Sequence, residues 1–477
     1  MTGISNNIFS YVSSLLGESA AKNFEEFIQK DPAQYIRVNT LKTDSERLYN
    51  TLLKDYSIQT EEIPNLANSL RIKDRSDILG KTVEHIIGEY YIQSLSSMLP
   101  PFILAPEPND KVLDLCAAPG SKTTELGEMM HNSGTLIANE IALDRVKMLV
   151  YNIDRMNIMN AGVVHYKGEW LSKKYNDHFD KILVDAPCSG LGIVQKKGEV
   201  NNWWSLERAE RLGDLQLRLL IAAVKMAKEG GEIVYSTCTL TPEENEFIID
   251  KVMQKYPVEI EDIVLPVKSI EGFTSYKGKT LNPAISKAKR ILPWEVDSDG
   301  FFIVKLKKTG KTISPEMTPP KSNNIKIIGY EKKDIKKLLN NIEVEFGING
   351  EELKKYKYLI KRNDIYFINE NWEENYLDIF ERIGTRFGII DKSGKVILHT
   401  QASQVLQKSI NKKIFIIDNL EDLKTYLDGG TIRNKKFESG QCVVKYKNSI
   451  LGTAIVTAQG IKSRFPRSKR TQEILIQ

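Results

Sequence analysis

Short apolar runs alternate with longer segments of helical periodicity between residues 106 and 308, and this alternation constrains the fold more than any other feature of the chain. It is typical of a parallel sheet covered by helices. The clearest helix is predicted over 206–228, where apolar residues recur every three or four positions before Gly230 and Gly231. The predicted strands are 111–115, 135–139, 163–166, 181–184 and 232–235. We therefore expect an α/β, doubly wound, Rossmann-like core that binds ligands beyond the carboxyl ends of its strands.

Other segments flank this core, since 477 residues give room for about three domains. Residues 1–105 predict a mixed, mostly helical N-terminal domain that contains the stretch YIRVNTLK. Three prolines among small polar residues predict a linker over 309–324. Short strand-like pieces and tight turns then predict an α+β or β-barrel domain over 325–477.

Composition excludes several classes of protein. The chain is 41% hydrophobic and 27% charged, as in ordinary globular proteins. It shows no apolar run near the roughly 20 residues that a membrane helix needs, and no secretory signal, so we expect a cytoplasmic protein without a membrane partner. Its cysteines, Cys116, Cys188, Cys238 and Cys442, have neither metal-ligand spacing nor the density of a disulfide framework. We therefore expect no bound metal.

Basic residues are concentrated at the C-terminal end. Residues 325–477 contain 28 basic and 19 acidic residues, whereas acids are in excess before them. Such asymmetry is associated with nucleic-acid contact, because cations that neutralise phosphates give affinity without sequence preference. The alternative is a solvated surface or a frayed tail. The predicted RNA contacts here are Lys462, Arg464, Arg467, Lys469 and Arg470.

The segment DLCAAPGSKTTEL, residues 114–126, follows the first predicted strand. Its small residues let the backbone approach a ligand, and Ser121 opens a helix whose amides could face an anion or a carboxylate. The segment matches neither the dinucleotide nor the P-loop pattern. Glu140, at the end of the second strand, could accept hydrogen bonds from ribose hydroxyls. Although a plain strand-to-helix connection is the alternative, the combination predicts S-adenosylmethionine as cofactor.

Cys188 and Cys238 each follow a predicted strand, in DAPCSGLG and YSTCTLTPEENE. Thr241, Pro242 and Glu244 predict a capping box with proline at the first helical position. Cys238 would then lie just before a helix N-terminus, where the helix dipole favours the nucleophilic thiolate. A lone cysteine is more often a small buried hydrophobe, which is what we expect of the other two.

Asp185 follows the strand that leads to Cys188. Such an acid can hydrogen-bond the edge of a base, or it can merely cap the next turn.

Together these motifs resemble the Sun family of RNA (cytosine-5)-methyltransferases. The resemblance covers residues 37–307, and its motifs stand in the family's order: RVNTLK, DLCAAPGSKT, DAPCSGLG, YSTCTLTPEENE and the closing strand SDGFFIVKL. A cysteine after proline alone would also fit DNA cytosine methyltransferases. The second cysteine, in Ser-Thr-Cys, points to the RNA enzymes.

The resemblance implies that Cys238 is the nucleophile, that Cys188 assists its release and that Asp185 lies between cofactor and cytosine. Lys122 is the fourth expected catalytic residue, and Arg37 in RVNTLK is expected to contact RNA. The expected cofactor-binding residues are Cys116, Ala117, Ala118, Pro119, Gly120, Ser121, Lys122, Glu140, Arg145 and Asp185.

One position departs from the family pattern. The family usually has an aspartate that binds the adenine amino group, but Lys167 stands at the matching position, where Glu169 or a backbone carbonyl could substitute.

Residues 388–465 weakly resemble the small PUA β-barrels of RNA-modifying enzymes. We therefore expect a monomer that methylates cytosine in structured ribosomal or transfer RNA. The alternative is a non-catalytic RNA-binding or ribosome assembly factor that retains the fold.

Overall fold

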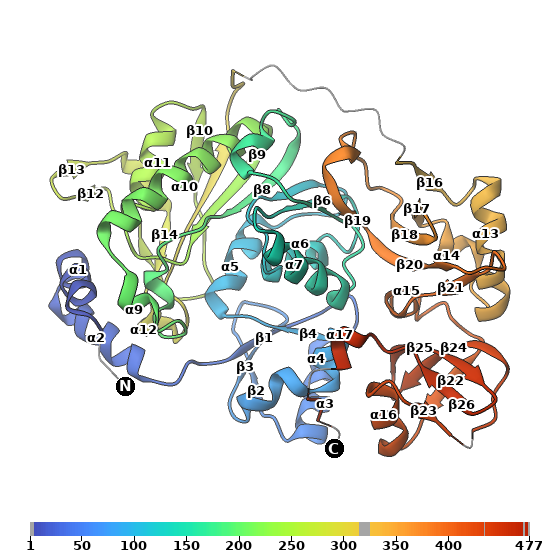
Figure 1. The fold of residues 1–477 in the computed structure, drawn as a ribbon. Helices are drawn as coiled ribbons and strands as arrows, with labels where there is room; N and C mark the ends of the chain where they lie inside the picture. The colour runs from blue at the N-terminus through green and yellow to red at the C-terminus, as the bar shows by residue number, and fades with distance from the viewer. Residues whose placement is uncertain (1–3, 314–324, 434, 471–472, 476–477) are drawn as a thin grey trace.

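The computed structural model describes residues 4–313, 325–433, 435–470 and 473–475 (Figure 1). Of the predicted linker, residues 309–313 have no helix or strand, and 314–324 lie outside the described residues.

The N-terminal residues form two separate units. Helices α1 (Asn6–Leu16) and α2 (Glu18–Gln29) pack on the core, where Val12 and Phe24 share an apolar cluster with Leu191 and Trp204. The second unit is an antiparallel sheet in the order β2-β3-β1-β4. Its elements are β1 (Tyr35–Val38), α3 (Ser45–Tyr56), β2 (Thr60–Glu62), β3 (Ser69–Ile72), α4 (Val83–Ile87), β4 (Tyr90–Ile92) and α5 (Leu95–Leu104). The expected helical domain thus also contains a sheet.

The central sheet is doubly wound, as predicted. Strands β7, β6, β5, β8 and β9 are parallel, and antiparallel β15, β14 and β11 continue the sheet beyond β9. Its elements are β5 (Lys111–Asp114), α6 (Ser121–Met129), β6 (Thr135–Asn139), α7 (Leu143–Met156), β7 (Ala161–Val164), α8 (Gly168–Leu171), β8 (Phe179–Asp185), α9 (Val200–Trp203), α10 (Leu206–Met226), β9 (Ala227–Thr237), α11 (Glu246–Met253), β10 (Val258–Glu261), β11 (Ile270–Glu271), β12 (Ser275–Tyr276), β13 (Lys279–Thr280), β14 (Lys289–Ile291), α12 (Pro293–Val296) and β15 (Phe301–Lys308).

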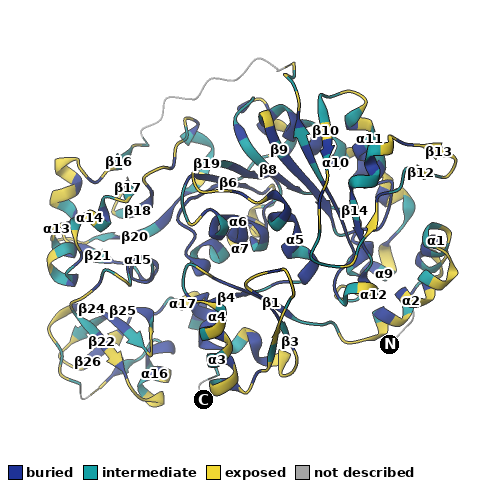
Figure 2. Ribbon diagram, turned by 180° about the vertical axis from the view of Figure 1, so that it is seen from behind, coloured by how far each residue is buried: buried dark blue, intermediate teal, exposed yellow. Residues whose placement is uncertain are grey.

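Alternate residues of each strand supply two hydrophobic cores, one on each face of this sheet. Leu113 and Ile137 belong to the core that contains α10 and α11, whereas their neighbours Val112 and Leu136 belong to the core that contains α5 and α7. Figure 2 shows this buried centre in dark blue. The predicted helix ends at Met226, because β9 starts at the next residue and contains both glycines.

The C-terminal region contains two five-stranded sheets, in the orders β16-β17-β18-β20-β21 and β22-β24-β25-β26-β23. Its elements are β16 (Ile327–Gly329), α13 (Lys333–Phe346), α14 (Gly350–Leu353), β17 (Tyr356–Lys361), β18 (Asp364–Asn369), β19 (Phe380–Ile383), β20 (Thr385–Ile390), β21 (Val396–Leu398), α15 (Thr400–Val405), β22 (Ile414–Ile417), α16 (Leu420–Leu427), β23 (Thr431–Ile432), β24 (Gly440–Tyr446), β25 (Ser449–Thr457), β26 (Gly460–Ser463) and α17 (Arg467–Arg470). The predicted start of the PUA-like region, at about residue 388, falls inside β20, which pairs with β21 in the first of these sheets.

The C-terminal region also completes the core sheet. Strand β19 pairs antiparallel with β7 and forms the outer strand at that edge (Figure 1). Arg382 on β19 forms an ion pair of 2.6 Å with Asp154 on α7, and Trp372 is 1% exposed. The predicted C-terminal domain therefore supplies a strand to the sheet of the predicted catalytic domain. Within the residues that the structure describes, no helix is long and apolar enough to cross a membrane.

Candidate active site

The predicted motifs converge on a cavity of about 200 Å³ at the carboxyl ends of β5, β8 and β9. Of the predicted site residues, Cys116, Ala117, Ala118, Pro119, Ser121, Lys122, Asp185 and Cys238 line it. The sequence interpretation missed the other lining residues, which are Ser94, Ser97, Asp114, Ile193, Asp299 and Phe301. Two of these, Asp299 and Phe301, lie in SDGFFIVKL, so the position of that motif beside β9 could have indicated them.

The two predicted cysteines are 50 residues apart in the sequence, but their Sγ atoms lie 3.0 Å from each other. Cys238 lines the cavity, whereas Cys188 contacts Cys238 without lining it. Both thiols are free and partly buried. The contact with Cys238, followed by burial, raises the pKa of the Cys188 thiol well above its ordinary value. Cys188 is therefore held as a protonated thiol next to Cys238.

Glu244 fixes the two cysteine loops together, which is a role that the sequence interpretation missed. Its carboxylate accepts hydrogen bonds from the Ser189 amide at 2.8 Å, the Thr241 hydroxyl at 2.6 Å and the Gln216 amide at 2.9 Å. The predicted capping box is wrong, because α11 begins only at Glu246. Cys238 thus does not lie just before a helix N-terminus, so the helix dipole gives no reason to expect a stabilised thiolate there.

Lys122 and Asp185 form an ion pair of 2.7 Å at the cavity wall. Ser97 accepts a further hydrogen bond from the Lys122 ammonium at 3.0 Å, and Ser236 donates to the other carboxylate oxygen of Asp185 at 2.7 Å. Burial alone would lower the pKa of Lys122, but the Asp185 carboxylate and Cys238 raise it above its ordinary value. The pair therefore places a fixed cation and a fixed anion beside Cys238.

The loop 116–120 is held from behind by α7. Arg145 donates to the Ala118 carbonyl at 2.5 Å and pairs with Glu140 at 3.3 Å. Gly120 has a φ of +108°, and a Cβ there would lie 3.2 Å from the Leu149 side chain, so glycine is required. Glu140 is 3% exposed and does not line the cavity. Glu140 and Arg145 thus support the loop in this structure.

Asp114 is an acid that the cofactor prediction did not include. It is 1% exposed, and its Oδ1 atom has no hydrogen-bond partner among the described residues, while Oδ2 accepts from Thr123 at 2.7 Å. Burial raises its pKa to about 7. A buried acceptor without a partner at a cavity wall suits a ligand that brings a hydrogen-bond donor.

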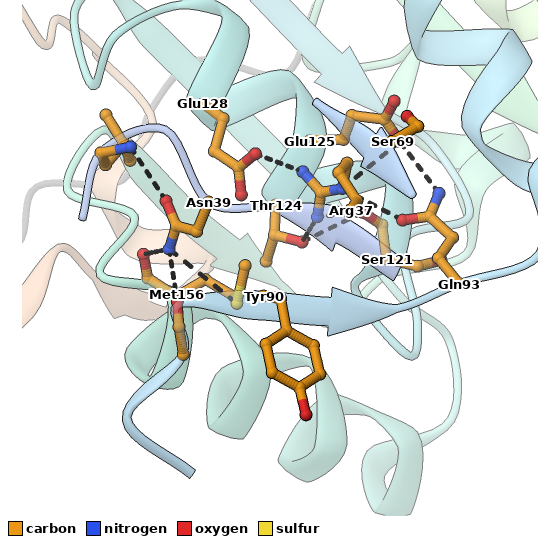
Figure 3. Close-up of polar contacts among 12 residues, drawn as sticks. Arg37, Asn39, Ser69, Tyr90, Gln93, Ser121, Thr124, Glu125, Glu128 and Met156 are labelled. Carbon is orange, nitrogen blue, oxygen red and sulfur yellow. Dashed lines mark hydrogen bonds and ion pairs between the residues drawn. The ribbon is translucent and has the colours of Figure 1, made fainter. Parts of the chain in front are cut away.

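The predicted RNA contact Arg37 is wrong, because its side chain is buried beneath α6 (Figure 3). It forms an ion pair of 2.7 Å with Glu128 and donates to the Thr124 hydroxyl at 2.8 Å and the Ser121 carbonyl at 3.3 Å. Because the whole residue is only 4% exposed, its guanidinium is not available to phosphate.

Lys469 is likewise excluded as an RNA contact, since it is 3% exposed and donates to the Ile86 carbonyl at 2.8 Å. Arg470 is half-buried and donates to the Phe465 carbonyl. The other three predicted contacts are exposed, unlike Lys469 and Arg470. They are Lys462, Arg464 and Arg467.

Lys167 is exposed, and its ammonium lies 4.6 Å from the centre of the Trp170 ring. A lysine cannot accept the hydrogen bond of an adenine amino group. Among the residues that the structure describes, no cluster of histidine, cysteine and carboxylate side chains could hold a metal ion.

The doubly wound sheet and its cavity define a Rossmann-like methyltransferase. Residues 101–307 match the family model described as 16S rRNA methyltransferase RsmB/F, and residues 4–95 match the N-terminal domain of 16S rRNA methyltransferase RsmF. The chain belongs to this family of RNA methyltransferases, which confirms the membership predicted from the Sun-family motifs. The expected PUA-like domain stays a prediction.

Known proteins resemble the chain over different lengths. Ribosomal RNA small subunit methyltransferase F of Shewanella piezotolerans is 32% identical and covers 97% of this chain and 96% of its own. The tRNA (cytosine(49)-C(5))-methyltransferase of Pyrococcus abyssi is 35% identical but covers 60% of this chain and 92% of its own. A solved structure, the methyltransferase homolog protein from Pyrococcus horikoshii, is 31% identical over 63% of this chain and 94% of its own, with a TM-score of 0.57.

Proposed function

We propose that this protein transfers a methyl group from S-adenosylmethionine to carbon 5 of a cytosine in small-subunit ribosomal RNA. The observation that carries the proposal is the cavity lined by Cys238, Lys122 and Asp185, with the Cys188 thiol 3.0 Å from that of Cys238. Ribosomal RNA is favoured over transfer RNA because the likeness to the Shewanella rRNA enzyme includes the C-terminal region, covering 97% of the chain. Ribosome assembly would place the enzyme in the cytoplasm.

The cavity fits the proposed cofactor. The residues at 116–119 are small, so the cofactor could approach the backbone that lines this side of the cavity. Asp114 Oδ1 has no hydrogen-bond partner among the described residues and could accept a hydrogen bond from the cofactor's amino group. When bound, S-adenosylmethionine would supply the methyl group as a sulfonium. The cofactor-binding residues of this proposal are Asp114, the loop from Cys116 to Lys122, and Asp185, with Glu140 and Arg145 behind the loop.

The chain's own residues would activate the base. Carbon 5 of cytosine is a poor nucleophile until the Cys238 thiolate adds to carbon 6. Asp185, held by Lys122 and Ser236, would stabilise the protonated ring nitrogen during this addition. Carbon 5 would then take the methyl group from the bound cofactor. Cys188, once its thiol has released its own proton, would help to remove the carbon 5 proton, and the electron pair of that C–H bond re-forms the double bond between carbons 5 and 6 as the bond between Cys238 and carbon 6 breaks.

The two cysteines give opposite expectations when each is replaced. Cys238→Ala should abolish methyl transfer, because no covalent bond to carbon 6 can form. Cys188→Ala should accumulate a protein joined to RNA, because release is blocked. The measurements are transfer of tritium from labelled cofactor to RNA and a denaturing gel for the adduct. Equal, mild rate losses in both variants without an adduct would contradict the assignment.

Cys442→Ala is the matched control, since this thiol is buried in the C-terminal region and should leave transfer unchanged. If the wild-type protein transfers no tritium to ribosomal RNA but still binds it, the alternative of a non-catalytic assembly factor holds instead.

A further inference from the structure

A polar groove runs along the seam between the N-terminal sheet, the core and the C-terminal region. One end is a cavity of about 360 Å³ between α3, α4 and the β24–β25 turn. The other end is a cavity of about 400 Å³ that reaches from Lys42 and Asn132 to Lys408. A small cavity of about 10 Å³ lies between them and shares Glu89 and Ser449 with the first cavity and Lys42 and Gln404 with the second.

The walls of this groove are fixed by contacts between segments far apart in the sequence. Arg47 on α3 donates to the Ser449 hydroxyl at 2.8 Å, and Ser449 donates to Glu89 at 2.5 Å. Lys447 forms an ion pair with Asp55 at the same end. The groove is therefore a fixed feature of the assembled chain.

The groove presents buried acceptor atoms that lack donors. Asn157 Oδ1 and Gln404 Oε1 have no hydrogen-bond partner among the described residues, and these two residues are 4% and 6% exposed. Asn157 lines the second cavity, and Gln404 lines both that cavity and the connection. Because buried polar atoms are usually satisfied, acceptors along one groove indicate a ligand that supplies N–H donors at intervals.

The rim adds cations that are free to contact phosphate. Lys54 on α3 and Lys408 after α15 are exposed, and neither forms an ion pair within the described residues. Three other lining cations pair with acids, which are Arg47 with Glu89, Lys447 with Asp55 and Lys355 with Glu352, and Lys42 donates to the Ile87 and Arg155 carbonyls. Isolated cations on a rim above acceptor atoms suit a strand with phosphates outside and bases inside.

The groove lies away from the proposed chemistry. Asn132 follows α6 and Asn157 follows α7, so both lie at the opposite ends of these helices from the loop at 116–120 and Arg145. Helix α6 is nine residues long, so its groove end and its cofactor-loop end are roughly 13 Å apart along the helix axis. The groove therefore lies outside the catalytic cavity and shares no lining residue with it.

We propose that this groove binds a single-stranded segment of the substrate RNA, whose base amino groups donate to Asn157 and Gln404 and whose phosphates contact Lys54 and Lys408. The inference rests on the proposed function, because it assumes an RNA substrate. It assigns the groove to docking of a folded RNA and not to the methyl transfer itself.

The test uses the full chain with Lys54 and Lys408 both replaced by glutamate. Both side chains are exposed, so the fold should be retained. We expect the Kd for fluorescein-labelled oligocytidine, measured by anisotropy, to rise about tenfold or more at low salt as two phosphate contacts are lost. The matched control is Lys251→Glu on α11, an exposed lysine outside the groove that should change the Kd less than about twofold. Oligouridine, which lacks exocyclic amino groups, should bind more weakly than oligocytidine.

Photocrosslinking of RNA and kinetics separate this proposal from the proposed function. We expect crosslinked peptides from 47–54 and 404–408, and a raised KM for ribosomal RNA with unchanged kcat in the double variant. Wild-type Kd and KM in that variant, or crosslinks confined to other surfaces such as 460–467, would overturn the groove while leaving methyl transfer intact. If the wild-type chain binds RNA in the groove but transfers no methyl group, the proposed function fails and the groove stands.

Discussion

Arg37 links the N-terminal sheet to the helix that follows the cofactor loop. Its guanidinium reaches from β1 to Ser121, Thr124 and Glu128, which are all on α6, and Gln93 after β4 bridges Arg37 and Glu125 (Figure 3). Burial raises the pKa of Glu125 to about 7 and that of Glu128 to about 8, even with Arg37 beside them. Among the described residues, Arg37 is the only cation within ion-pair distance of Glu125 and Glu128. These two acids therefore depend on Arg37 to balance their charge.

Replacing Arg37 by methionine should destabilise the fold by about 3–5 kcal/mol, because it leaves buried carboxylates unpaired. The free energy of unfolding in urea at pH 8 measures this loss. Adding Glu125→Gln and Glu128→Gln should restore a large share of it. A stable Arg37→Met protein with weakened RNA binding would contradict the buried role and restore the contact predicted from the sequence.

At the scale of elements, the short helix α17 joins the C-terminal end of the chain to the N-terminal sheet. Lys469 donates to the Ile86 carbonyl at the end of α4, and Arg155 from α7 donates to the neighbouring His85 carbonyl at 2.8 Å. Burial, followed by repulsion from Arg155, lowers the pKa of Lys469 to about 7. Segments from three regions of the chain thus meet at one helix end.

This lowered pKa predicts a pH dependence of stability. Above pH 7 the folded chain holds Lys469 neutral, whereas the unfolded chain keeps it protonated up to about 10.5, so stability should rise with pH in this window. The contribution is at most about 1.4 kcal/mol per pH unit. Urea unfolding between about pH 7 and 9.5 should show a smaller slope for Lys469→Met than for the wild type. The exposed Lys462→Met is the control, and an equal slope in all three proteins would refute the assignment.

At the scale of the whole molecule, β19 unites the core sheet with the C-terminal region. It covers the edge of β7, where a Cβ on Gly162 would lie 2.4 Å from the Phe380 ring. The side chain of Asn369 also donates to the Gly134 carbonyl of the core at 3.0 Å. An uncovered edge strand pairs readily with other chains, so this arrangement also protects the core.

A fragment that ends at residue 313 should therefore lose this protection. We expect it to associate and to unfold at a lower temperature than the full chain, because the edge of β7 and the surface under Trp372 become exposed. Light scattering and thermal unfolding of both proteins at equal concentration provide the measurement. A monomeric fragment with the Tm of the full chain would show that the core does not need β19.

The sequence by itself determined the order of the core strands along the chain, the cofactor loop and the two cysteines. These features depend on local patterns, because apolar runs form buried strands and the carboxyl ends of parallel strands meet at one edge. Only the tertiary structure decided which charges are free. The sequence predicts that Arg37 and Lys469 contact RNA, yet packing between regions of the chain buries both side chains.

Tertiary structure also decided the role of Glu244 and the place of β19. The spacing of Thr241 and Glu244 predicts a helix cap, but the helix starts later and Glu244 instead fixes the loops of Cys188 and Cys238. The pairing of β19 with β7 joins segments that are far apart along the chain, as in the partners Ile383 and Gly162. Hydrogen bonds between such distant segments leave no periodic pattern in the sequence, so the sequence determined which chemical groups are present, and the fold determined which of them meet.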